Sequence, residues 1–331
     1  MRPRIVAHTV SYPPFRRVGA ELATHNLLRY LVGQGWEAAV VPHGATALDG
    51  WPKRRATSID VDGVTVHHPA TSALLPADIV YAHIPFTRQA RRHADRVGAR
   101  FVAALHGGPP GWGAARLAEV GADLTIANSE TMRISLERTG LPVHVLRPPV
   151  YAQEHDAGET ERAGHCITLV NPNRDKGGDL FAELASRLGG VRFLAVGGGY
   201  ACEDVPDFSR LRNVEVLPHG TPMVEVWRRT RILLMPSKAE SWGMVAVEAM
   251  INGIPVIGST APGLVECLGC AGRTLPLDDV DAWEGACLSL LTGVGEYGPA
   301  RMRAYRRAAE LDPTPDLRAT ERALVALIDR S

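Results

Sequence analysis

Short apolar runs alternate with amphipathic stretches along the chain, and this alternation predicts strands interleaved with helices. Residues 19–33 place four leucines at helical spacing, which predicts an amphipathic helix. Ser129 and Gly140 have the residue types that begin and end a further helix. The strands predicted in this half are residues 4–8, 38–41, 64–67, 79–82, 101–105 and 124–126. The pattern is typical of a doubly wound α/β domain.

The alternation stops at residues 151–164, which are polar, acidic and without period, and then starts again. We interpret this stretch as a linker and expect two domains, residues 1–153 and 154–331. The tail from residue 280 is predicted to be mostly helical, with breaks at residues 293–299 and 312–315. In the second domain we expect strands at residues 166–170, 191–196, 214–217, 232–235 and 255–257, with a helix at 178–188.

Composition narrows the function. A chain of 331 residues suits two domains of about 150 residues each. The 36 basic and 36 acidic residues cancel, so no overall field favours nucleic acid. The five cysteines are scattered, and no apolar run approaches a membrane span. We also expect no signal sequence. We therefore expect a cytoplasmic protein without a transmembrane segment.

Residues 236–266 are the most informative segment of the chain. They predict a strand end, a loop at residues 239–243, and a helix from Met244 that stops at Gly253. Ser241, Gly243 and the first amides of this helix are expected to direct N–H groups at one point. A helix N-terminus carries partial positive charge, so this point suits an anion, above all a phosphate.

Two carboxylates, Glu240 and Glu248, flank the predicted anion site and are separated by seven residues. Glu240 lies at the mouth of the site. Glu248 lies one turn into the helix, where its carboxylate can accept hydrogen bonds from hydroxyls. A phosphate site beside such carboxylates indicates a ligand with a diphosphate and sugar hydroxyls, which describes a nucleotide sugar. The alternative is an ordinary strand–loop–helix unit with two surface glutamates, which the surrounding residues disfavour.

This segment resembles the E-x7-E signature of family 4 retaining glycosyltransferases, which have the GT-B fold. The resemblance covers nearly the whole chain and is most specific at residues 213–276. It implies two Rossmann-like doubly wound domains facing an interdomain cleft. The first domain binds the acceptor, the second binds the nucleotide sugar, and the last helix, about residues 316–330, crosses back to the first domain.

The resemblance also implies roles for individual residues. Glu240 contacts hydroxyls of the transferred sugar, and Glu248 holds the ribose. Met244 and Val245 offer backbone amides to the diphosphate. The residues expected to face the donor sugar with Glu240 are Ser241, Trp242 and Gly243.

Lys176 and Gly177 match the Lys-Gly pair of the family, and Lys176 is expected to stabilise the diphosphate. The arginine that the family usually has earlier in this loop is replaced, because Asn171 or Pro172 stands in its place. Arg174 is a candidate to supply the missing charge. For Lys176 and Arg174 the alternative is a solvated helix entry.

Three further matches lie at loops after predicted strands. Gly19 and Ala20 fall where the family has a Gly-rich loop over the donor phosphate, although only one glycine of the usual pair is present. His106 matches the family histidine near the reacting sugar carbon, and His83 is a second candidate. Gly198 belongs to a glycine cluster, residues 197–199, expected to line the nucleotide side; it lacks the dinucleotide-binding spacing.

These expectations combine into a function. We predict a retaining, metal-independent hexosyltransferase that moves a sugar from a nucleoside diphosphate to a small-molecule or glycoconjugate acceptor, such as a natural product. No cofactor is expected. The acceptor would be read by loops at residues 44–59 and 86–93. The alternatives are a GT-B protein that binds a nucleotide sugar without transferring it, an epimerase, and a phosphorylase, the last disfavoured by a chain with three lysines.

Arginines at four nearby positions form a basic stretch in the predicted helical tail: Arg301, Arg303, Arg306 and Arg307. We expect a solvated helix face here, in preference to peripheral contact with a membrane surface or an anionic acceptor.

Overall fold

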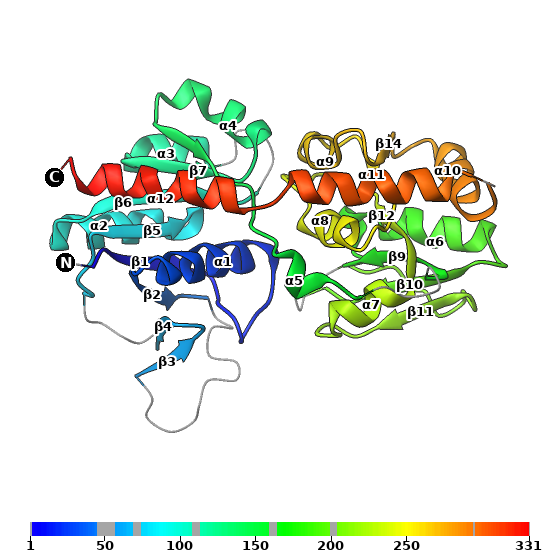
Figure 1. Cartoon of the computed structure of the whole chain (residues 1–331), viewed down its shortest axis with the longest axis horizontal. Helices are drawn as coiled ribbons and strands as arrows, with labels where there is room; N and C mark the ends of the chain where they lie inside the picture. Colours follow the sequence, from blue (N-terminus) through cyan, green and yellow to red (C-terminus); the bar gives the residue numbers. More distant parts are fainter. Residues whose placement is uncertain are drawn as a thin grey trace. The chain divides into compact units, whose positions relative to one another are not determined.

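The computed structural model describes residues 2–44, 57–68, 74–107, 113–158, 164–198, 204–293 and 295–330. The chain folds into two compact units (Figure 1). The first comprises Met1–Pro149 and Pro313–Ser331, and the second comprises Val150–Asp312.

The first unit is built on one twisted sheet whose described strands run in the order β3-β4-β2-β1-β5-β6-β7-β8. All neighbours are parallel except β3 and β4. The six strands predicted in this half are confirmed, and β3 and β8 were not predicted. The strands are β1 (Arg4–Thr9), β2 (Glu37–Pro42), β3 (Ser58–Val61), β4 (Val64–His67), β5 (Ile79–His83), β6 (Arg100–Leu105), β7 (Leu124–Ala127) and β8 (Val143–Val145).

Helices alternate with the strands along the chain and pack against the sheet. The predicted helix at 19–33 is confirmed as α1, and Ser129 caps α4 by accepting a hydrogen bond from the amide of Met132 at 3.1 Å. The helical elements of the unit are α1 (Gly19–Gly33), η1 (Ile84–Phe86), α2 (Thr87–Val97), α3 (Ala114–Val120), α4 (Glu130–Leu136), η2 (Glu137–Thr139) and α12 (Thr314–Ile328).

The prediction of an acceptor loop at residues 86–93 is wrong, because most of these residues form α2. The buried positions of α2 are Thr87, Ala90, His93 and Ala94. Small and polar residues thus face the sheet where a leucine stripe would have marked a helix. Of the other expected loop, residues 45–56 lie outside the described residues, and β3 begins at Ser58.

The last helix, α12, is part of the first unit and packs against β8 and α1. Leu317 and Leu324 are buried on its inner face. Thr320 is also buried there, and its Oγ1 lies 3.0 Å from Nε2 of His144.

The second unit has a wholly parallel sheet in the order β11-β10-β9-β12-β13-β14. Apolar cores fill both faces of this sheet, one under α8 and α9 and one under α6 and α10. Its strands are β9 (Cys166–Val170), β10 (Arg192–Val196), β11 (Val214–Leu217), β12 (Thr230–Met235), β13 (Val256–Ser259) and β14 (Arg273–Leu275). Its helices are α5 (Ala152–His155), η3 (Arg174–Lys176), α6 (Gly178–Arg187), α7 (Met223–Arg229), α8 (Met244–Ile251), α9 (Pro262–Leu268), α10 (Val280–Thr292) and α11 (Tyr297–Glu310).

The stretch expected to be a linker begins inside the second unit. It contains the short helix α5, and Asn252 ties it down. The Asn252 side chain accepts a hydrogen bond from the Ala157 amide at 2.8 Å and donates one to the His155 carbonyl at 2.9 Å. Residues 159–163 of the expected linker lie outside the described residues.

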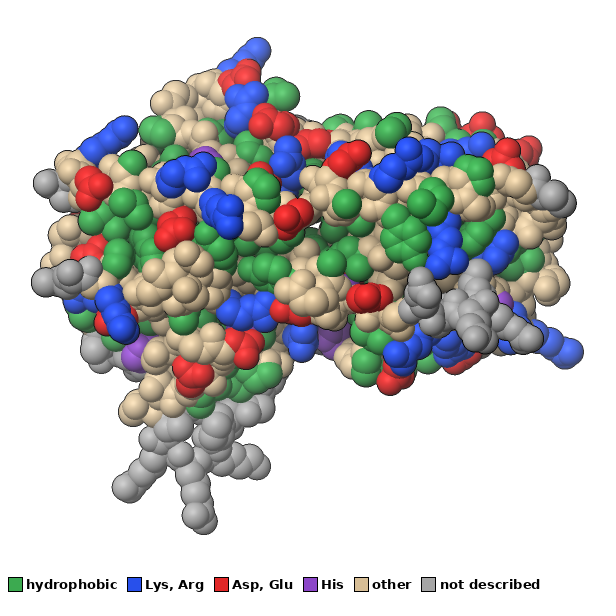
Figure 2. Space-filling view, viewed as in Figure 1, with side chains coloured by type: hydrophobic (Ala, Val, Ile, Leu, Met, Phe, Trp, Pro, Cys, Tyr) green, Lys and Arg blue, Asp and Glu red, His purple; other side chains and the backbone are tan. Residues whose placement is uncertain are grey.

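Charged side chains of both signs are interspersed on the face drawn in Figure 2, in keeping with the balanced composition. Within the described part of the chain, none of the helices has both the length and the apolar character needed to cross a membrane.

Candidate functional site

The site is centred where the strand order of the second sheet changes direction, between β9 and β12. In an open parallel sheet, ligands bind outside the carboxyl ends of the strands at such a point. The loop after β9 carries Lys176, which was predicted to contact the diphosphate, and the loop after β12 carries Glu240, which was predicted to contact the sugar. Parallel topology thus brings these two sequence segments to the same edge.

Lys176 and Glu240 contact each other directly. Nζ of Lys176 donates a hydrogen bond to Oε2 of Glu240 at 2.7 Å. The Lys176 side chain is 34% exposed and that of Glu240 is 14% exposed, so a ligand can reach the pair. Asn173 caps the turn that carries Lys176, because its side chain accepts a hydrogen bond from the Lys176 amide at 2.8 Å.

The two loops are also joined through their backbones. The amide of Lys238 donates to the carbonyl of Asp175 at 2.8 Å. Gly177 has a φ of 86°, and a Cβ at this position would collide with the carbonyl oxygen of Pro236. Only glycine permits both this conformation and this close approach, which explains the Lys-Gly pair in structural terms.

Gly243 begins the helix that follows Glu240. It has a φ of 110°, and α8 runs from Met244 to Ile251. The partly buried Met244 and Val245 form the first turn, where helical N–H groups lack intrahelical partners. This is the expected geometry for an anion site.

Trp242 differs from its expected place. Its side chain is 2% exposed and belongs to the core under α8 and α9. The indole ring therefore anchors the loop, and only the backbone of Trp242 remains for a ligand. Ser241, before it, is half-buried.

Glu248 lies on α8 with 6% of its surface exposed. Its Oε2 is 3.3 Å from Nδ1 of His155, on α5. Asn252 donates hydrogen bonds to the carbonyls of both Glu248 and His155, at 2.8 and 2.9 Å. This histidine partner was not predicted, since α5 falls within the stretch interpreted as a linker.

Arg174 is held by acidic neighbours. Its guanidinium pairs with Asp179 and, at 3.0 Å, with Asp204. These pairs raise the pKa of Arg174 and neutralise its charge locally. Asn171 has a φ of 59°, a left-handed conformation that glycine adopts readily.

His106 and its neighbours lie at the carboxyl edge of the first sheet. Nε2 of His106 is 2.9 Å from the Tyr81 hydroxyl and 3.5 Å from Oγ1 of Thr24. The Thr24 hydroxyl is also 2.8 Å from Nε2 of His83. Burial lowers the pKa of His106 to about 4, so the ring is neutral near pH 7. Thr24 and Tyr81 were missed because they lie inside a predicted helix and a predicted strand, whereas candidates were sought in the loops that follow strands.

Gly19 and Ala20 form the first turn of α1, one turn before Thr24. They share the first unit with His106, whereas Lys176, Glu240 and Glu248 belong to the second. Gly198 follows β10 at the carboxyl edge of the second sheet. Residues 199–203, which follow it, lie outside the described residues.

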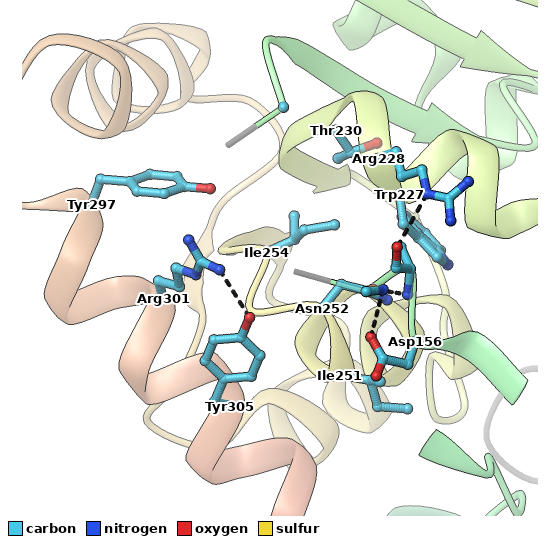
Figure 3. Close-up of a pocket in the computed structure, with 13 residues that line it drawn as sticks. Asp156, Trp227, Arg228, Thr230, Ile251, Asn252, Ile254, Tyr297, Arg301 and Tyr305 are labelled. Carbon is cyan, nitrogen blue, oxygen red and sulfur yellow. Dashed lines mark hydrogen bonds between the residues drawn. The ribbon is translucent and has the colours of Figure 1, made fainter. Parts of the chain in front are cut away.

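A cavity of about 260 Å³ opens at the amino ends of the strands of the second sheet (Figure 3). It lies by the starts of β12 and β13 and is lined by Asn252, Ile254, Arg301 and Tyr305, among others. In Figure 3 the guanidinium of Arg301 reaches the Tyr305 hydroxyl, at 3.0 Å. This cavity is distinct from the Lys176–Glu240 site, which lies at the carboxyl ends of the strands.

The arginine stretch of α11 is not a uniformly solvated face. Arg307 donates hydrogen bonds to the carbonyls of Cys267 and Glu266, at 2.9 and 2.8 Å. It thereby caps the C-terminus of α9, where a cation is favourable. Arg303 is exposed.

Comparison with known proteins supports the resemblance. Residues 165–293 match the family described as Glycosyl transferases group 1. The D-inositol 3-phosphate glycosyltransferase of Mycobacterium marinum is 28% identical over 223 residues, which are 63% of this chain and 47% of that protein. That of Mycobacterium tuberculosis is 29% identical over 227 residues, 64% of this chain and 43% of that protein. The chain thus spans about half the length of the curated relatives it matches.

Solved structures establish the fold. Anabaena HepE in complex with UDP-glucose superposes with a TM-score of 0.78 at 14% identity, covering 97% of this chain and 99% of that one. Sucrose-phosphate synthase of Thermosynechococcus elongatus gives 0.76 at 14% identity, covering 100% of both chains. The GT-B fold expected from the sequence is confirmed, and so is the resemblance to group 1 glycosyl transferases.

Proposed function

We propose, from the GT-B fold and the match to group 1 glycosyl transferases, that this protein transfers a sugar from a nucleoside diphosphate sugar to a hydroxylated acceptor. The observation that carries the proposal is the pairing of Lys176 with Glu240 at 2.7 Å, beside the N-terminus of α8. A cation, a carboxylate and a helix start at one sheet edge suit a diphosphate linked to a sugar.

Departure of the nucleoside diphosphate is the step that these groups assist. Negative charge grows on the leaving oxygens, where Lys176 and the amides of Met244 and Val245 would stabilise it. Preorganised donors aimed at developing charge are worth about 3 kcal/mol each. In this proposal they do the work of a divalent cation, and the transfer is metal-independent.

Glu240 holds the sugar in place. Its carboxylate is bound to Lys176, so donor binding would exchange part of this ion pair for sugar hydroxyls and diphosphate. We propose that the reaction retains the anomeric configuration. The acceptor attacks on the face that the diphosphate leaves, and its proton passes to the departing phosphate.

Glu248 is proposed to accept hydrogen bonds from the ribose. Its carboxylate is buried, and a hydroxyl pair of a ribose would satisfy the oxygen now 3.3 Å from His155. Buried carboxylates require such partners.

The acceptor is proposed to be a small hydroxylated molecule or glycoconjugate. The curated relatives are named for an inositol phosphate, a small polyol, which supports this class. Natural products and sugar conjugates with free hydroxyls belong to the same class.

A two-step assay tests the proposal. Thermal shifts with UDP-, GDP-, ADP- and TDP-sugars identify the donor, and transfer is then measured to myo-inositol, D-inositol 3-phosphate and an alkyl glucoside, with and without EDTA. We expect one nucleotide class to raise Tm and to support transfer with retention, insensitive to EDTA. Binding without transfer to any acceptor would instead support a non-catalytic nucleotide-sugar-binding protein.

A further inference from the structure

A second group of histidines lies at the carboxyl edge of the first sheet. His8 is on β1, His43 follows β2 directly, and His93 is on α2. Nδ1 of His8 is 2.8 Å from Nε2 of His43, and Nε2 of His8 is 2.8 Å from Nδ1 of His93. Nε2 of His93 is 2.8 Å from the carbonyl oxygen of Leu75. The three rings form a continuous hydrogen-bonded chain that ends on the backbone.

The carbonyl of Leu75 fixes the direction of the hydrogen bonds between the three histidines. The Leu75 oxygen can only accept, so Nε2 of His93 carries a proton. In a neutral ring Nδ1 of His93 then accepts, and Nε2 of His8 must donate to it. Nδ1 of His8 accepts in turn from Nε2 of His43. His43 is therefore left with its lone pair on Nδ1.

Neutral rings are the form that the surroundings favour. His8 and His93 are each 5% exposed. The ion pairs recorded between described residues include none of the three histidines. Burial lowers the pKa of His43, and burial with repulsion from His43 and His93 lowers that of His8 to about 3. A buried cation without a carboxylate partner is costly. This cost opposes a charged His93 ring, which would donate from Nδ1 to His8 and so reverse the direction of the hydrogen bonds.

His43 is the least buried of the three histidines. Its amide donates to the carbonyl of Thr9 at 2.9 Å, which holds it at the ends of β1 and β2. Its half-buried ring packs on Phe86, with ring centroids 4.9 Å apart. An aromatic wall beside one directed polar atom is typical of small-ligand sites. A lone pair there favours a hydroxyl and repels the oxygens of a phosphate.

Given the proposed glycosyl transfer, on which this inference rests, we infer that His43 is a positioning residue for the acceptor. Nδ1 of His43 accepts a hydrogen bond from an acceptor hydroxyl, and His8 and His93 hold His43 in the tautomer that can do so. The group selected at His43 is a neutral hydroxyl.

Nitrogen NMR tests the proposed histidine tautomers independently of enzyme activity. Long-range ¹H–¹⁵N correlation spectra of histidine-labelled protein at pH 7.5 report which ring nitrogen carries the proton. We expect His43 in the Nε2–H form in the wild type, and a mixture of tautomers in His93→Leu. A wild-type His43 protonated at Nδ1 would overturn the inference.

Kinetics test the role in positioning. With the donor and acceptor that give the highest rate in the panel above, His43→Phe should raise the acceptor KM about fivefold to tenfold, the loss expected for one neutral hydrogen bond. Donor KM should stay near wild type, and His43→Asn should recover part of the loss. Tm should fall in His43→Phe, because the buried Nδ1 of His8 loses its donor. His165→Phe, at an exposed histidine of the second unit, is the matched control.

The outcomes separate the two proposals. Wild-type transfer with an unchanged acceptor KM in His43→Phe would refute the inference alone. A wild type that binds nucleotide sugar but transfers to no acceptor would refute the proposed function, and this inference with it.

Discussion

Nζ of Lys176 donates a hydrogen bond to Oε2 of Glu240 at 2.7 Å, which joins the loops after the two strands at the centre of the second sheet. The contact holds cation and carboxylate together beside the N-terminus of α8, where we propose that diphosphate and sugar bind. Preorganisation of this kind avoids rearrangement during the reaction.

Replacing Lys176 should remove transition-state stabilisation. For Lys176→Met we expect kcat to fall about 10²- to 10³-fold, as when one preorganised donor is lost. Steady-state transfer assays measure this. Lys238→Met is the matched control, because the Lys238 side chain is 61% exposed and pairs with Asp175 at 3.1 Å. Equal losses in both variants would contradict the role of Lys176.

Replacing Glu248 should weaken nucleotide binding. Hydrogen bonds to a charged group contribute about 1.5–3 kcal/mol, so Glu248→Gln should raise the Kd of the preferred nucleoside diphosphate by about tenfold or more. Isothermal titration calorimetry gives the value. Glu119→Gln, at a carboxylate 58% exposed in the first unit, should leave the Kd unchanged. A wild-type Kd in Glu248→Gln would exclude ribose contact.

Alanine substitutions at Gly243 and Gly285 should have opposite effects on the free energy of unfolding. Gly243 has a φ of 110°, and an added Cβ would lie 3.1 Å from Cδ1 of Leu264, so Gly243→Ala should lower the free energy of unfolding by about 1 kcal/mol or more. Gly285 lies within α10 with open space around it, so Gly285→Ala should raise that free energy by up to about 1 kcal/mol. Urea unfolding measures both, and a loss in Gly285→Ala would contradict the argument.

Stability should fall on mild acidification. The pKa of His8 is lowered to about 3 and that of His106 to about 4, mainly by burial, whereas an unfolded histidine titrates near 6.5. Below pH 6.5 the unfolded chain therefore binds protons that the folded chain excludes. Each histidine should reduce the unfolding free energy by about 1.4 kcal/mol per pH unit as the pH falls from 6 towards 4.

Urea unfolding at pH 7.5, 6.5, 5.5 and 5.0 checks this pH dependence. His8→Gln keeps a hydrogen-bonding side chain but cannot titrate, so its stability should fall less steeply with pH than that of the wild type. Parallel curves for the two proteins would show that His8 does not contribute.

The sequence predicted the strands well because buried parallel strands are marked by continuous apolar runs such as residues 166–170. It failed at α2, whose sheet-facing positions are alanine and histidine, and at α5, which is only four residues long. Local patterns carry no information on such tertiary placement.

Some features of the candidate site could likewise be predicted from the sequence, and others could not. Glycines that require left-handed backbone, such as Gly177 and Gly243, mark their loops in the sequence. The burial of Trp242 and the partnership of Glu248 with His155 depend on elements distant in sequence. A histidine at or just after the ends of β1, β2, β5 and β6 was a usable signal for the polar edge of the first sheet.

The assignment of α12 to the first unit has a consequence for biosynthesis. All the elements of the second unit leave the ribosome before Thr314–Ile328 does, so the later-encoded unit can finish folding while the earlier one still lacks a helix. Until then the surface of β8 and α1 that Leu317 and Leu324 cover is open to water. An expression fragment of the first unit should accordingly be a fusion of residues 2–149 to 313–330, because a simple cut after Pro149 would leave this apolar surface bare.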